Sequence, residues 1–299
     1  MNEPSETISS GRKGRARSAP AAEAEVAGSP APASAARRGQ LVVVGTGLRT
    51  VGQMTTESIA WIRAADRVLY VVGDPVAERA IHDLNPEGAE SLQTLYGEGK
   101  DRQVTYDSMV ERVLECVRGN ERVCAVFYGH PGVFVYPSHE AIQRARAEGY
   151  SAVMLPGVSA EDCLFADVGI DPATTGCLSY EATDFLFQNR AMDPASALVL
   201  WQIGVLGNAR YRAEGRYPTP LMPFLIQKLA LRYPLAHEAI VYEAAVQLGC
   251  KPRLTRVPIA YLQHVDLSAA STLFVPPSEA SQPDAALLAQ LQALGVQFG

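Results

Sequence analysis

The stretch YGHPGVFVYPSH (128–139) holds residue types suited to binding a small molecule, and it connects an apolar run typical of a buried strand to a run with helical spacing. Gly129 and Gly132 permit backbone conformations or close approaches that a side chain would block, and the aromatic residues offer flat apolar faces. A rigid, glycine-opened loop at the C-terminal end of a strand is where α/β folds bind small molecules. The loop could also be an elaborate strand-to-helix connection without a ligand, and its residues alone leave both interpretations open.

Two further loops also follow apolar runs. GTGL (45–48) lacks the third glycine of a GxGxxG dinucleotide fingerprint, because Thr50 stands at that place. In LPGVSAEDCLFADVG (155–169), Ser159 and Asp162 have the spacing of a helix capping box, a role that needs no ligand. All three loops follow strands of one predicted parallel sheet, so their tips should converge on one edge of that sheet.

The elements that must position these loops alternate along the first half of the chain. Near-continuous apolar strands that alternate with helices indicate a parallel α/β sheet with both faces covered. The predicted strands are 41–47, 67–72, 122–129 and 151–157, and the predicted helices are 55–66, 74–84, 106–119, 138–149 and 159–169.

The pattern changes after Gly176. Five runs read as strands, 177–187, 197–204, 239–246, 253–262 and 271–277, with one helix among them at about 219–232 and another in PDAALLAQLQALG. This texture predicts a second α/β subdomain with a more mixed sheet. We therefore expect a disordered tail over residues 1–39, an N-terminal α/β subdomain over 40–175 and a C-terminal α/β subdomain over 176–299.

The composition excludes several classes of function. A net charge of −6 argues against a nucleic-acid-binding surface, because phosphate contacts require an excess of basic residues. No apolar run approaches the roughly 18–20 residues of a membrane span. The five cysteines are scattered through apolar stretches, and the five histidines never fall at HxH or HExxH spacing. We therefore expect free thiols in a reducing cytoplasm and no metal.

Residues 1–39 differ in kind from the remainder. They are almost all Ala, Ser, Pro, Gly and charged residues, and Ile8 and Val26 are the β-branched aliphatic residues among them. Such a segment cannot bury enough apolar surface to offset the entropy of ordering. Its four glutamates argue against a transit peptide, and it has no apolar core of a signal peptide.

The loop sequences together carry a resemblance. GTG, GHPGVF and LPGVSAEDCLFADVGIDP resemble the tetrapyrrole-methylase fold, whose enzymes use S-adenosyl-L-methionine held in the cleft between two α/β domains. Within that fold, the combination of VGQMT, YGEGKDRQVTY, VFYGHPGVFVYPSH, MLPGVSAEDCLFAD and CLSYEATDFL resembles the borosin peptide-backbone α-N-methyltransferases. The resemblance runs from about Gln40 to Pro277.

The resemblance implies a set of cofactor-binding residues and a set of catalytic residues. The catalytic set is Arg102 and Tyr106, supported by Tyr96 and Tyr128, and the sequence departs from the family pattern at Gln93, where another tyrosine would lie. A tyrosine that acts as a base needs its pKa of about 10 lowered, and a neighbouring arginine shifts it in that direction. The implied cofactor contacts are Tyr128, His130, Val133, Phe134, Ser159, Ala160, Gln202, Ala244, Ser271 and Thr272.

The resemblance also implies partners. The chain ends about 22 residues after STLFVPP, so we expect the split bacterial arrangement, with a separate precursor peptide as substrate, and a homodimer. Two other functions stay open. One is methylation of a precorrin-like macrocycle, and the other is a catalytically idle peptide-binding relative, which the change at Gln93 suggests.

Overall fold

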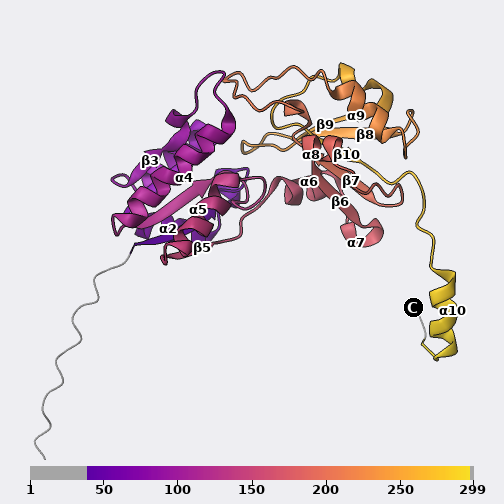
Figure 1. The fold of residues 1–299 in the computed structure, drawn as a ribbon, viewed down its shortest axis with the longest axis horizontal. Coiled ribbons are helices and arrows are strands. Elements are labelled where there is room, and N and C mark those ends of the chain that lie inside the picture. Colours follow the sequence, from indigo (N-terminus) through magenta and orange to yellow (C-terminus); the bar gives the residue numbers. More distant parts are fainter. Residues whose placement is uncertain (1–38, 297–299) are drawn as a thin grey trace, which may run out of the picture. The chain divides into compact units, whose positions relative to one another are not determined.

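A computed structural model describes residues 39–296 of the chain (Figure 1). The tail predicted over residues 1–39 lies outside the described residues, except for Gly39. Gly39 packs closely enough on Val117 that a Cβ there would lie 1.9 Å from the Val117 carbonyl oxygen.

The first sheet is parallel throughout and has five strands in the order β3-β2-β4-β1-β5. Strand β3 is three residues long and was not predicted, because so short a strand leaves no apolar pattern in the sequence. The strands are β1 (Gln40–Gly45), β2 (Arg67–Val71), β3 (Ala89–Ser91), β4 (Arg122–Phe127) and β5 (Ser151–Met154).

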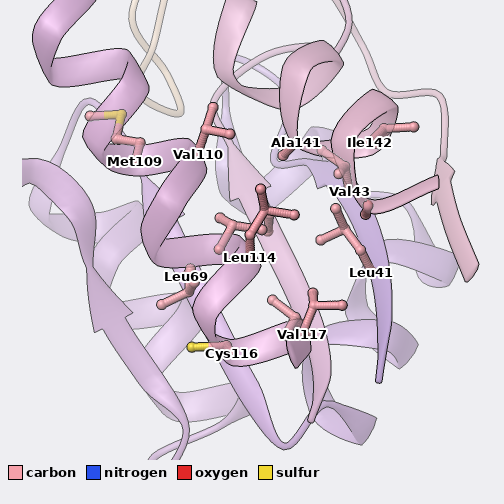
Figure 2. Packing of buried hydrophobic residues seen from close by; sticks show 14 of the residues in the cluster. Leu41, Val43, Leu69, Met109, Val110, Leu114, Cys116, Val117, Ala141 and Ile142 are labelled. Atoms are coloured by element: carbon pink, nitrogen blue, oxygen red, sulfur yellow. The ribbon is translucent and has the colours of Figure 1, made fainter. Parts of the chain in front are cut away.

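Helices cover both faces of this sheet, as the apolar strands predicted. Helices α4 (Arg102–Arg118) and α5 (Tyr136–Ala147) pack on the face that carries Leu41 and Val43, and Figure 2 shows this cluster. Helices α2 (Thr56–Ala64) and α3 (Pro75–Leu84) pack on the opposite face. Full burial of one such Leu or Val side chain stabilises the fold by about 1.5–3 kcal/mol.

The second sheet is mixed, which confirms the prediction. Its order is β6-β7-β10-β8-β9; the pair β6–β7 is parallel and the other pairs are antiparallel. The strands are β6 (Cys177–Glu181), β7 (Ala197–Trp201), β8 (Glu238–Glu243), β9 (Arg253–Pro258) and β10 (Thr272–Val275).

The helices of the second sheet also lie on two faces. Helices α8 (Ala182–Phe187) and α9 (Met222–Leu229) and the 3-10 helix η3 (Ile259–His264) bury their apolar residues against one face. Helix α6 (Ala160–Val168) buries Cys163 and Leu164 against the other. Although α6 follows strand β5 of the first sheet, it packs on the second, and this connects the two layers of strands.

Three predicted element limits differ from the structure by four or more residues. The run 177–187 is a strand only to Glu181, because the Glu181 carboxylate accepts the N–H of Asp184 and begins α8. The run 253–262 leaves the sheet at Pro258, whose missing N–H cannot continue the ladder. Helix α4 begins at Arg102 rather than at 106, because Asp101 caps it by accepting the Gln103 N–H.

The remaining short elements complete the described chain. They are α1 (Thr50–Gln53), η1 (Leu92–Leu95), α7 (Pro172–Thr175), η2 (Ile203–Val205) and α10 (Ala285–Ala293). Among residues 39–296 no helix is long and apolar enough to cross a membrane. The division of the folded part at residue 175 stays a prediction.

Candidate active site

The three strand-end loops converge, as the sequence predicted. Strands β4, β1 and β5 are neighbours, so the segments that follow them emerge side by side. The first two segments are bonded to each other: Gly129 N–H donates to the Gly47 carbonyl at 2.9 Å, and Gly47 N–H donates to the Gly129 carbonyl at 3.2 Å. A Cβ at Gly45 would lie 2.1 Å from the Gly129 oxygen, so this close crossing requires glycine.

A cavity of about 450 Å³ opens above these loops. Its size falls within the range of about 300–1,000 Å³ that is typical of small-molecule sites. Of the ten residues that the resemblance assigned to the cofactor, nine line it: Tyr128, His130, Val133, Phe134, Ser159, Ala160, Gln202, Ala244 and Thr272.

Two strained residues lie in the wall of this cavity. Phe134 and Gln202 have φ values of 56° and 61°, a region that non-glycine residues rarely adopt. The Phe134 ring lies 5.8 Å from the ring of Trp201, centre to centre, and both residues line the cavity. Backbone strain of this kind persists where the surroundings impose it and is concentrated at binding sites.

Ser159 caps helix α6 as predicted. Its hydroxyl accepts the Asp162 N–H, and the Asp162 carboxylate accepts the Ser159 N–H at 2.7 Å, which completes the capping box. The cap fixes the start of α6 at the cavity wall, so Ser159 and Ala160 line the cavity whether or not the serine touches a ligand.

His130 presents one ring nitrogen to the protein. Its Nδ1 accepts the Gly132 N–H at 2.9 Å, so in the neutral ring the proton sits on Nε2. A Cβ at Gly132 would meet Met154 Sδ at 2.6 Å and His130 Cε1 at 3.2 Å, so a larger residue there would displace both side chains. His130 can therefore donate a hydrogen bond toward the cavity that it lines.

Ser271 is the one predicted cofactor residue that does not line the cavity. Its buried hydroxyl donates to the Glu243 carboxylate at 2.5 Å and accepts the Ser268 N–H at 2.8 Å. Glu243 also binds Arg253 at 2.6 Å and the Ser268 hydroxyl at 2.6 Å. Burial alone would raise the pKa of Glu243, but the hydrogen bonds from Ser268 and Ser271, with the charge of Arg253, lower it.

This carboxylate gives a testable dependence of stability on pH. Because the folded pKa lies below the unfolded value of about 4.3, the ionised group contributes stability that is present above that value and is lost as the pH falls through the folded pKa. Glu243→Gln should lower the free energy of unfolding by about 2 kcal/mol at pH 7, measured by urea unfolding. The difference from wild type should shrink below about pH 4.

Glu238 on the same strand supplies the control. It pairs with Arg256 on the surface, where its side chain is 56% exposed, and Glu238→Gln should change stability by less than about 0.5 kcal/mol. An equal loss for Glu243→Gln at both pH values would contradict a charge-dependent network.

The residues predicted to be catalytic gather at the N-terminus of α4. Arg102 is the first residue of the helix, and Tyr106 follows four residues later on the same face. The helix N-terminus carries partial positive charge, to which the Arg102 guanidinium adds. This end of α4 is therefore suited to stabilise negative charge that develops on a carbonyl oxygen.

Tyrosine rings connect this cluster to the cavity. The Tyr96 ring meets the Tyr106 ring edge to face at 6.5 Å, and Tyr106 lies 6.3 Å from the ring of Tyr136. Tyr128, which lines the cavity, lies close enough to Tyr96 to raise its pKa, and Tyr106 in turn raises the pKa of Tyr128. Tyr128 therefore belongs to both the cavity and the cluster.

Two of the tyrosines predicted to be catalytic, Tyr96 and Tyr128, have raised pKa values. Burial raises the pKa of Tyr96 above its usual value, Tyr106 and Tyr128 add to the shift, and Arg102 acts weakly in the opposite direction. The pKa of Tyr128 is also raised, chiefly by loss of water around its hydroxyl in the crowded cleft, although 55% of the residue's surface faces open space. The expected lowering by arginine is thus outweighed at Tyr96.

Gln93 has a local structural role. Its side-chain amide donates to the Val72 carbonyl at 3.1 Å, at the end of strand β2. Gln93 therefore makes this side-chain hydrogen bond at the position where the resemblance would place a tyrosine.

Sequence reasoning missed several residues at the site. Trp201, Tyr242 and Asp74 line the cavity, and Asp74 also caps α3 by accepting the N–H groups of Val76 and Ala77. Trp201 stands beside Gln202 at a strand end, which was a usable signal. Tyr211 and Tyr217, which contact Tyr96 and Arg102, lie in the irregular segment ARYRAEGRYP, where no periodicity marked them.

The cavity fits the expected cofactor in size and chemistry. Aromatic walls at Phe134 and Trp201 suit a flat base, while the His130 ring, the Thr272 hydroxyl and the Asp74 carboxylate suit hydroxyl and amino groups. Within residues 39–296, no group of three or more His, Cys, Asp or Glu side chains could hold a metal ion.

Comparison with known proteins places these features in context. The profile of the family described as Tetrapyrrole (Corrin/Porphyrin) Methylases matches residues 40–245. The uroporphyrin-III-C-methyltransferase from Thermus thermophilus has a similar fold, with a TM-score of 0.55 over 80% of this chain and 93% of its own, at 18% identity.

Closer relatives are found among curated sequences. The methyltransferase/ribosomally synthesized type I borosin cyclic peptide precursor of Coprinopsis marcescibilis is 44% identical over 250 residues, which are 82% of this chain and 64% of the relative. The methyltransferase/ribosomally synthesized cyclic peptide omphalotin A precursor of Omphalotus olearius is 40% identical over 262 residues, 86% of this chain and 62% of the relative. The chain thus spans less than two thirds of the length of these relatives.

Proposed function

The chain belongs to the tetrapyrrole (corrin/porphyrin) methylase family, and on this premise we propose that it uses S-adenosyl-L-methionine to N-methylate backbone amides of a ribosomally made peptide. One observation carries the proposal. Tyr128 lines the cavity that fits the cofactor, and its phenol lies close enough to Tyr106 and Arg102 that both affect its pKa. A peptide amide that reaches this cluster would therefore lie next to the cavity.

The chemistry explains why such a cluster is needed. An amide nitrogen is a weak nucleophile, because its lone pair is delocalised into the carbonyl. Bound S-adenosyl-L-methionine would supply an electrophilic methyl group. For the nitrogen to accept it, the N–H proton must leave and negative charge must gather on the carbonyl oxygen.

The residues of the chain divide this work. Arg102, which stays protonated, and the N-terminus of α4 stabilise the oxygen. Tyr106, which has to be in its phenolate form for this step, takes the amide proton and is left as a neutral phenol. Tyr96 and Tyr128, whose raised pKa values keep them neutral, donate hydrogen bonds and exclude water. The cavity residues orient the cofactor so that the two reactants meet, which by itself accounts for much of the rate.

We also propose how the substrate arrives. The peptide is a separate precursor that binds in a groove between the subunits of a homodimer, as the resemblance implied, whereas the curated relatives are named as methyltransferase and precursor in one protein. The enzyme works in the cytoplasm, where its five cysteines, all free in the structure, stay reduced.

The test offers the chain two acceptors in the presence of methyl-labelled S-adenosyl-L-methionine. One is a synthetic peptide rich in Val, Ile and Gly, and the other is a uroporphyrinogen-type macrocycle. We expect label in the peptide and none in the macrocycle. Label only in the macrocycle would overturn the proposal in favour of tetrapyrrole methylation, and peptide binding without label would indicate an idle relative. The intact mass of the chain itself shows whether it methylates its own residues.

A further inference from the structure

The segment 208–217, which follows β7 and η2, pairs with the loop that leads into α4. Gly99 N–H donates to the Tyr211 carbonyl at 2.9 Å, and Tyr211 N–H donates to the Lys100 carbonyl at 2.9 Å. Arg102 N–H donates to the Ala209 carbonyl at 3.0 Å. The first turn of a helix leaves its N–H groups without partners inside the helix, and the segment 208–217 thus supplies the partner of Arg102.

The same segment contacts the side chains of the cluster. The Arg102 guanidinium lies over the ring of Tyr217, 5.0 Å from its centre, and the Tyr96 ring lies 4.6 Å from that of Tyr211. These two tyrosines are half-buried, whereas residues 212–214 and 216 between them are exposed. The segment therefore turns its aromatic side chains toward the cluster and its charged residues toward solvent.

The ring of Tyr217 is itself held in place. Its hydroxyl accepts the Arg212 N–H at 2.9 Å, which closes the segment on itself. At the base, the Asn208 side chain donates to the carbonyls of Leu206 and Pro218, at 3.0 and 2.9 Å. The ring is a fixed platform rather than a loose side chain.

An aromatic platform has a different effect on an arginine than a carboxylate would have. Among the described residues no carboxylate pairs with the Arg102 guanidinium, whereas the other two arginines of α4, Arg112 and Arg118, are bound to glutamates. A ring face attracts the cation without neutralising it and leaves the N–H groups at its edge free to donate. Arg102 therefore keeps both its charge and its donors for a substrate carbonyl.

We propose that Tyr217 is a positioning residue, which acts through Arg102 by holding the guanidinium where the amide oxygen of the substrate develops charge. The proposal rests on the proposed function and adds a residue to it from the second half of the chain. The segment 208–217 joins that half to the cluster, so the geometry of Arg102 depends on both halves.

Two substitutions separate the ring from the hydroxyl. Tyr217→Leu removes the aromatic face and should lower the single-turnover rate constant about 2- to 30-fold, with little change in cofactor affinity. Tyr217→Phe keeps the aromatic ring face beneath Arg102 and should therefore retain most of the wild-type rate constant. Tyr180→Leu is the matched control. Tyr180 also holds an arginine over its ring, with Arg190 5.9 Å from the ring centre, but this pair is not part of the cluster. The Tyr180→Leu substitution should therefore leave the rate constant unchanged.

A double substitution shows whether Tyr217 acts through Arg102. In the Arg102→Ala background, Tyr217→Leu should cause no further loss of rate. A further loss of the same size as in wild type, or a Tyr217→Phe enzyme as slow as Tyr217→Leu, would overturn the positioning role.

A measurement without substrate keeps this question apart from the proposed function. The Nε–Hε signal of Arg102, assigned by its absence in Arg102→Lys, should be shifted by the ring current of Tyr217. The shift should disappear in Tyr217→Leu and persist in Tyr217→Phe, even if the wild-type chain methylates no peptide. Identical signals in all three proteins would overturn the contact itself.

Discussion

Arg102→Ala and Tyr106→Phe should each slow single-turnover methylation by roughly 10²-fold or more, which is the scale for losing an oxyanion donor or an acid/base group. Both residues stand on one face of the first turns of α4, so in the proposed reaction both can reach the same substrate amide. They act chiefly in the transition state, and cofactor affinity should hardly change in either variant. Mass spectrometry of the peptide at saturating cofactor measures the rate.

The neighbouring positions provide graded controls. Tyr96→Phe should cost less, because a neutral phenol with a raised pKa positions its neighbours rather than taking a proton. Gln93→Ala should cost less still, since its amide binds the Val72 carbonyl and no member of the cluster. A Tyr106→Phe enzyme at near wild-type rate would rule out Tyr106 as the acceptor of the amide proton.

Gly45→Ala should weaken cofactor binding by about 10²-fold or prevent folding. The new Cβ would lie 2.1 Å from the Gly129 carbonyl oxygen and 2.9 Å from Pro131 Cδ, so the segments after β1 and β4 must separate. Both segments line the cavity through Gly47 and Gly129, which means that the separation opens the site directly. Calorimetry with S-adenosylhomocysteine measures the affinity, and urea unfolding measures the stability.

Gly52→Ala is the matched control. It lies in the nearby helix α1, and a Cβ there would meet no atom within 4 Å. Alanine is also favoured over glycine within a helix by about 1 kcal/mol, so this variant should bind the cofactor normally and be at least as stable as wild type. Wild-type affinity and stability in Gly45→Ala would show that the crossing of the two segments is not needed.

Local chemistry made parts of the site predictable. The capping box at Ser159 and the glycines where the two segments cross could be recognised in the sequence. Each of these residue types satisfies a local requirement of the backbone, a helix cap or a close approach. The convergence of three loops followed from one inference, that their strands are parallel and adjacent. The strands of the first sheet, apart from the short β3, could be predicted because they are almost continuously apolar.

The parts that the sequence did not reveal depend on contacts between distant segments. The start of α4 at Arg102 required both the Asp101 cap and the Ala209 carbonyl, the latter more than a hundred residues away. Tyr217, whose ring lies beneath Arg102, is in an irregular segment. No hydrophobic periodicity and no helix-capping residue marks its position in the sequence. The family resemblance assigned Ser271 to the cofactor-binding residues. Its hydroxyl instead donates a hydrogen bond to Glu243, a partner that no local sequence pattern indicates.

The position of the transferred methyl group tests the proposed chemistry most directly. After single-turnover reaction with methyl-labelled S-adenosyl-L-methionine, the peptide is hydrolysed completely in acid and its amino acids are separated. The proposed reaction predicts label in N-methyl α-amino acids from wild-type enzyme and its loss with Arg102→Ala. Label in side-chain or ester methyl groups, with no N-methyl amino acids, would contradict backbone N-methylation.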